Sequence, residues 1–113
     1  MKYLLQIRFT GAAEKIARLP DEERRRVTSD FEQLRRQPGI ETARRLHDTD
    51  TALTVQARDG HTTVVSGLPV PPLDSLDGYY VYDGDLDGAT AVAARVPVLR
   101  FGGSVEIRPL RGD

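Results

Sequence analysis

Apolar and polar residues alternate over positions 3–9, and this period of two predicts a half-buried strand at the start of the chain. The apolar side chains of that strand are Tyr3, Leu5, Ile7 and Phe9. A short helical turn is expected after it, over residues 12–19.

Residues 20–36 have the pattern of an amphipathic helix. Val27, Phe31 and Leu34 follow one another at i, i+4 and i+7, which predicts one buried stripe. Pro20 suits the first turn of a helix, where its missing N–H has no intrahelical partner. Three acidic residues then lie at the positive end of the helix dipole, and two arginines lie at its negative end.

The middle of the chain is predicted to hold a β-hairpin between two loops. Asp59-Gly60 favours a tight turn in which both residues have positive φ, and it joins strands expected at 52–58 and 61–65. Residues 40–50 show no clear period and are expected to form a loop, with at most a short extended piece. Three prolines make 66–75 a stiff loop.

The last third of the chain predicts a strand, a capped helix and a final strand. The strands are expected at 78–82 and 104–110. Asp85 is expected to cap the helix, and Pro97 to end it. The helix residues expected to face the sheet are Leu86, Ala89 or Thr90, and Ala93.

These elements in order predict an α+β, ferredoxin-like βαββαβ domain with an antiparallel sheet, formed by residues 1–113 as a single domain. The net charge is −1, which gives no overall attraction to nucleic acid or to an anionic membrane. With no cysteine there is no disulfide, thiolate zinc site or cysteine nucleophile. We see no signal peptide and no membrane span, so a cytoplasmic protein is expected.

Alternation along the strands predicts two different sheet faces. The face expected to lie under the helices carries Leu5, Ile7, Leu53, Val55, Ala57, Val105 and Ile107. The opposite face is expected to carry Gln6, Arg8, Thr54, Gln56, Arg58, Glu106 and Arg108, together with Tyr80 and Tyr82. A solvated face would explain this composition. Tyrosines beside paired charges also suit the lining of a ligand cavity.

Three segments resemble the YCII-related, or DGPF-domain, family. They are the Gly78-Tyr79-Tyr80 strand, the Asp85-Leu86-Asp87-Gly88-Ala89 helix start, and the Gly102-Gly103-Ser104-Val105-Glu106-Ile107-Arg108-Pro109 end. The resemblance covers the first strand and most of the chain from about Leu53. It implies a homodimer in which two sheets face each other as an α+β barrel, with a ligand cleft between sheet and loops.

The chain departs from the family at two positions of proposed acid–base chemistry. Ser66-Gly67-Leu68-Pro69 replaces the family's Asp-Gly-Pro-Phe, and arginines replace the histidine of the first long helix. Asp74 lies where the family usually has an acidic residue before the Gly-Tyr strand. The resemblance therefore leaves Asp74 as the acidic position that can be carried over.

Candidate catalytic residues are Asp74 and His47. Asp74 lies in a proline-stiffened loop, where a carboxylate suits general acid–base chemistry, or it caps a turn. His47 precedes Asp48, which could orient its imidazole, although a surface histidine is the simpler interpretation. The candidate substrate-binding residues are Arg8, Arg58, Tyr80, Arg108 and Ser66.

No metal site or cofactor is predicted. Residues 83–88 resemble the opening of a calcium loop, but its twelfth position is Ala94 rather than a glutamate. His61, beside the hairpin turn, is expected to be exposed, and the two histidines lack a metal-ligand spacing.

The leading hypothesis is a dimeric protein that binds a small polar or anionic organic molecule and transfers protons without a cofactor. Isomerisation, dehydration, dehydrohalogenation or cyclisation would fit, with arginines holding an anion. The alternatives are a non-catalytic ligand-binding or regulatory module, and a purely structural dimeric partner.

Overall fold

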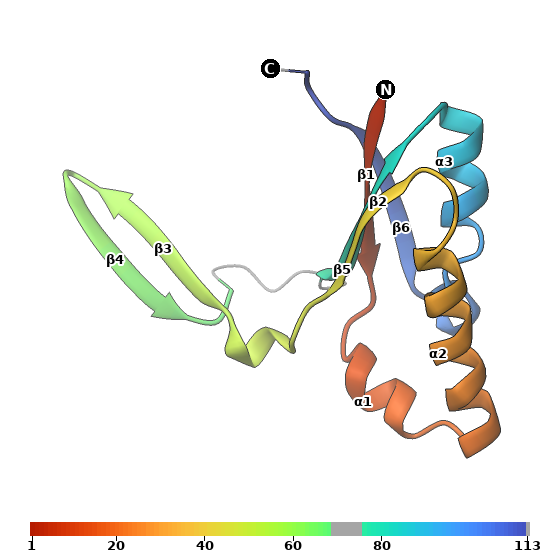
Figure 1. Ribbon diagram of the computed structural model, residues 1–113. Helices are drawn as coiled ribbons and strands as arrows, with labels where there is room; N and C mark the ends of the chain where they lie inside the picture. Colours follow the sequence, from red (N-terminus) through yellow and green to blue (C-terminus); the bar gives the residue numbers. More distant parts are fainter. Residues whose placement is uncertain (69–75, 113) are drawn as a thin grey trace.

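A computed structural model describes residues 1–68 and 76–112 and shows a four-stranded antiparallel sheet. In sheet order, its strands are β2 (Ile40–Arg45), β5 (Leu76–Asp83), β1 (Lys2–Arg8) and β6 (Ser104–Pro109). The helices are α1 (Ala12–Ala17), α2 (Asp21–Arg35) and α3 (Leu86–Ala93), with the 3-10 turns η1 (Thr49–Thr51) and η2 (Pro97–Phe101). Helices α2 and α3 lie on the same side of this sheet (Figure 1).

The predicted ferredoxin-like fold is confirmed. Strand β1, helix α2 and strand β2 form one half, and β5, α3 and β6 form the other. The first strand of each half, β1 and β5, lies in the middle of the sheet, and the two halves interleave in the order β2-β5-β1-β6. The fold is therefore βαββαβ as expected, but its second strand is β2, from a segment for which a loop was predicted, rather than a strand of the hairpin.

The core lies between this sheet and the helices. Leu5 and Ile7 are fully buried, and the stripe of α2 predicted from its spacing is buried against them. Ala89 and Ala93 of α3 also face inward, but Leu86 is exposed, contrary to expectation. The predicted cap is present: the Asp85 carboxylate accepts a hydrogen bond from the Gly88 N–H at 2.7 Å.

The predicted hairpin forms, but it does not join the main sheet. Strands β3 (Leu53–Arg58) and β4 (His61–Ser66) pair only with each other among the described strands. Asp59 and Gly60 have positive φ, as the tight turn requires. The hairpin projects from the helix-covered sheet (Figure 1), and the radius of gyration is 15.9 Å where about 13 Å is usual for this length.

This projection corrects the predicted sheet faces. Leu53 and Val55, expected under the helices, are 68% and 63% exposed. The edge position beside β5 is occupied by β2 instead of by a hairpin strand, although residues 40–50 were predicted to form a loop. Apolar alternation identified β3 as a strand, but alternation does not specify which strand it will pair with.

Tyr80 and Tyr82 were also assigned to the wrong face. Tyr80 pairs with Leu5 across β1, so both side chains point to the helix side, and Tyr80 is 3% exposed. Tyr82 packs against the same core. Tyr79 and Val81 therefore occupy the face opposite the helices, together with Leu4 and Gln6.

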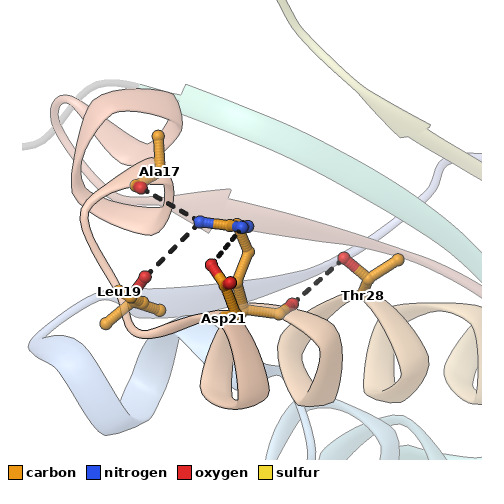
Figure 2. A network of polar contacts seen from close by, with 5 residues as sticks. Ala17, Leu19, Asp21 and Thr28 are labelled. Carbon is orange, nitrogen blue, oxygen red and sulfur yellow. Dashed lines mark hydrogen bonds and ion pairs between the residues drawn. The ribbon is translucent and has the colours of Figure 1, made fainter.

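Polar contacts of Arg24 fix the junction between α1 and α2. Its guanidinium donates to the carbonyls of Ala17 and Leu19, at 3.3 and 3.5 Å, and to the Asp21 carboxylate at 2.7 Å. Figure 2 shows these contacts and the bond from the Thr28 hydroxyl to the Arg24 carbonyl. Arg24 thus holds the end of α1 against the start of α2.

Candidate functional site

A β-bulge at the start of β5 places an aspartate at the centre of the candidate site. Ile7 of β1 pairs with Gly78 and Arg8 pairs with Leu76, so Asp77 has no partner residue across β1. Bulges re-aim side chains and are frequent near active sites. The backbone of Asp77 is held on the other side, where its carbonyl accepts from the Leu46 N–H at 2.7 Å.

The Asp77 side chain is buried, with 8% of the residue exposed. Its carboxylate accepts a hydrogen bond from Arg45 at 2.9 Å, and the Arg45 guanidinium stacks on the Phe31 ring, 4.5 Å from its centroid. Burial raises the pKa of Asp77 above its ordinary value of 3.8, Arg45 opposes this rise, and the charge of Asp48 adds to it. Asp77 is thus a protected carboxyl that retains its proton more strongly than a surface aspartate.

Asp77 lines a cleft of about 240 Å³, smaller than the roughly 300–1,000 Å³ of pockets for drug-sized ligands, so a fitting ligand would be small. Three segments supply its walls: residues 9–12 after β1, residues 47–50 after β2, and Leu76 with Asp77. Gly11 has φ of +68° at the entry to α1, a conformation that favours glycine and turns the chain around the cleft. Loops from two strand ends thereby meet at the bulge of a third.

His47 belongs to this cleft. Its side chain is exposed and lines the cleft together with Asp48, Asp50 and Asp77. The arrangement places an imidazole and a buried carboxyl on the walls of the same opening. The other predicted catalytic residue, Asp74, lies outside the described residues.

The predicted substrate-binding residues are not brought together in one chain. Arg8 and Arg108 lie on the sheet face opposite the helices, and Arg8 is paired with the Glu106 carboxylate. Arg58 lies beside the turn of the projecting hairpin, and Ser66 lies at the end of β4. Tyr80 points to the helix side instead. The expected cluster of Arg8, Arg58 and Arg108 is therefore not formed within the chain.

The Asp77 cleft is lined by acidic side chains, whereas the sequence predicted a site lined by arginines. Asp48, Asp50 and Asp77 line it, and Arg45 is the partner of one of them. Among residues 1–68 and 76–112, no three histidine or acidic side chains are placed to hold a metal ion. Within the same described ranges, no helix is long and apolar enough to cross a membrane.

Asp77 was not predicted as a site residue because a strict alternation of side chains assumes a regular strand and does not reveal a bulge. One signal was present: Asp77 is a charged residue directly before Gly78, at the entrance to a strand that is otherwise apolar and aromatic. A charge and a glycine together in a central strand indicate a bulge or a close backbone approach. Gly78 has such an approach, to the carbonyl oxygen of Arg44 on the neighbouring strand.

Comparison with protein-family models gives no match, and comparison with curated proteins gives no match either. The family resemblance seen in the sequence thus remains a prediction.

Proposed function

We propose that this protein binds a small polar organic molecule in the Asp77 cleft and transfers a proton on it without a cofactor. The observation that carries the proposal is a buried aspartate, at a bulge, that lines a cleft of about 240 Å³. Its raised pKa brings it closer to neutrality, where a carboxyl is a more effective general acid or base. His47 on the same cleft supplies an imidazole, a second side chain that can accept or donate a proton.

The chemistry available to these residues is removal of a proton at one atom and delivery at another. That covers isomerisation, elimination of water or a halide, and cyclisation, the reaction classes expected from the sequence. Because three carboxyl groups line the cleft and Arg45 is committed to Asp77, we propose that the substrate is neutral or cationic at the end that enters. An anionic substrate would place like charges together.

A non-catalytic binding module is the second candidate, and the ion pair between Asp77 and Arg45 favours it. A carboxylate held at 2.9 Å by a guanidinium that is itself stacked on Phe31 also serves to fix β2 against β5. In that case the cleft would bind a ligand without catalysing a reaction of it.

Screening small metabolites by NMR in deuterated water tests both candidates. We expect saturable shifts for residues 9–12 and 47–50, and binding weakened about tenfold in Asp77→Asn, the scale of one charged hydrogen bond. If the wild type incorporates deuterium into the ligand or converts it, Asp77→Asn should not, and the control Asp87→Asn should. This result would support an enzyme. Binding without exchange supports the module. Shifts confined to other parts of the chain would contradict both.

We also propose that the protein is a homodimer formed through the sheet face opposite the helices and the projecting hairpin. Leu53, Val55 and Val64 share one hairpin face and are exposed, although apolar surface of this kind is normally covered. Leu4 and Val81 lie on the sheet face opposite the helices. The family resemblance, which implies a dimer, supports the same proposal.

Light scattering at tens of micromolar should therefore give the mass of two chains. Val55→Glu introduces a charge on the apolar hairpin face and should weaken the dimer at least tenfold, since burying an unpaired charge is costly. The matched control is Gln56→Glu, which adds the same charge to the other face of β3 and should leave the dimer unchanged. A wild-type mass of one chain would rule the dimer out.

A further inference from the structure

A second cavity, of about 140 Å³, lies between helix α2 and the edge strand β2. Phe31, Glu32 and Arg35 of α2 form one side, and residues 43–45 of β2 form the other. Tyr80 of β5 also lines it. This groove shares no lining residue with the Asp77 cleft. Arg45 lines the groove and pairs with Asp77, but the proposed function places no ligand in the groove.

The Tyr80 hydroxyl is the first unusual feature of the groove. Tyr80 is 3% exposed, and buried tyrosine hydroxyls normally find a hydrogen-bond partner. Among the described residues, this hydroxyl has no hydrogen bond, and no fully enclosed side-chain oxygen or nitrogen lacks a partner. The hydroxyl is therefore not fully enclosed, and Tyr80 lines the groove. Burial raises the pKa of Tyr80 to about 12, so the group is a proton donor throughout the physiological range.

The second feature is a pair of loosely held guanidinium groups. Arg35 and Arg44 both donate to the carbonyl of Ala43, at 3.4 and 3.2 Å, which brings two like charges close together. The ion pair of Arg35 with Glu32 is long, at 3.8 Å. Arg45, in contrast, is held by Asp77 at 2.9 Å. Three arginines therefore face two carboxylates, and most N–H groups of Arg35 and Arg44 are free for a ligand.

We propose that this groove binds the oxyanion group of a small molecule, a carboxylate or a phosphate, through Arg35, Arg44 and the Tyr80 hydroxyl. Guanidinium groups recognise both oxyanions in a bidentate manner, and one negative charge would balance the local excess. The Ala43 carbonyl accepts a long hydrogen bond from each of the two guanidinium groups and so keeps both beside the groove. The cavity volume suits an oxyanion with a few attached atoms.

NMR titration at constant ionic strength tests the site, with succinate and inorganic phosphate as probes and neutral succinamide as the uncharged control. We expect succinate or phosphate to give saturable shifts of the Tyr80 ring and the Arg35 side chain, and succinamide to give none. Binding of one probe alone identifies the oxyanion, and binding of both supports the shared chemistry.

Arg35→Gln is expected to weaken binding about tenfold or more, and Tyr80→Phe about fivefold, the scales of a charged and a neutral hydrogen bond. The matched control is Arg26→Gln, an exposed arginine of the same helix outside the groove, which should change binding less than twofold. Equal weakening by Arg26→Gln and Arg35→Gln would overturn the proposal, as would shifts by succinamide. If Tyr80→Phe unfolds the protein, the comparison of the two arginine variants still decides the question.

Discussion

Arg45→Met is expected to lower the free energy of unfolding by about 3 kcal/mol at pH 7, because it leaves the buried carboxylate of Asp77 without its partner. We take the lower end of the usual range because the Arg45 side chain is 39% exposed. The stacking of its guanidinium on Phe31 is lost as well. Urea unfolding followed by circular dichroism measures the change.

The pH dependence of this loss distinguishes a buried charge from lost packing. The pKa of Asp77 is raised in the folded state, so this group stabilises the fold fully at a pH below 3.8, its ordinary pKa. The contribution is lost as the pH rises through the pKa of the folded state. Without Arg45 the folded pKa rises further. The difference between Arg45→Met and wild type should therefore shrink as pH falls from 8 to 5.

Two control variants complete this test. Asp77→Asn in the Arg45→Met background removes the unpaired charge and should recover part of the lost stability. Arg44→Met makes the same substitution at the neighbouring position, which is not paired with Asp77, and should change stability by less than about 0.5 kcal/mol. A loss in Arg45→Met that is equal at pH 5 and pH 8 would show that the charge of Asp77 is not the cause.

Gly78→Ala is expected to destabilise the protein by about 3 kcal/mol, the upper end of the usual cost of overpacking. A Cβ at this position would lie 2.6 Å from the carbonyl oxygen of Arg44, which belongs to the backbone of β2 and cannot rotate away. Strand β2 would have to separate from β5 beside the Asp77 bulge.

Thermal and urea unfolding measure this loss, and Gly112→Ala is the control. A Cβ at Gly112 meets no atom within 4 Å, so that variant should be neutral. Because the strain in Gly78→Ala lies next to Asp77, ligand binding in the Asp77 cleft should weaken too. Stability equal to wild type would mean that β2 does not lie against β5 as described.

The local elements and the fold class were largely predictable from the sequence. The stripe of Val27, Phe31 and Leu34, the Asp85 cap and the Asp59-Gly60 turn depend on residues close together in the chain, and all three are present. Strand pairing depends on residues far apart. Alternation in β3 therefore predicted a strand correctly and its place in the main sheet wrongly.

The site was less predictable, for the same physical reason. The bulge at Asp77 shifts the pairing register between β1 and the start of β5. A strict period of two does not predict such an extra residue. His47 was identified from its type and from its neighbour Asp48. Its place on the same cleft as Asp77 depends on the pairing of β2 with β5, which residues far apart in the chain determine. Tyr80 was predicted to bind a ligand on the sheet face opposite the helices. Its side chain lies on the helix side, and we propose that it binds a ligand there.

The central claim is that Asp77 is a buried acid, available for proton transfer on the wall of its cleft. Carbon-detected NMR of the Asp77 side-chain carboxyl, followed from pH 2 to pH 8, tests this claim most directly. We predict a midpoint above 3.8, the ordinary value for aspartate, because burial outweighs the attraction of Arg45. A midpoint at or below 3.8 would contradict it, because Asp77 would then be an ordinary ion-pair partner of Arg45.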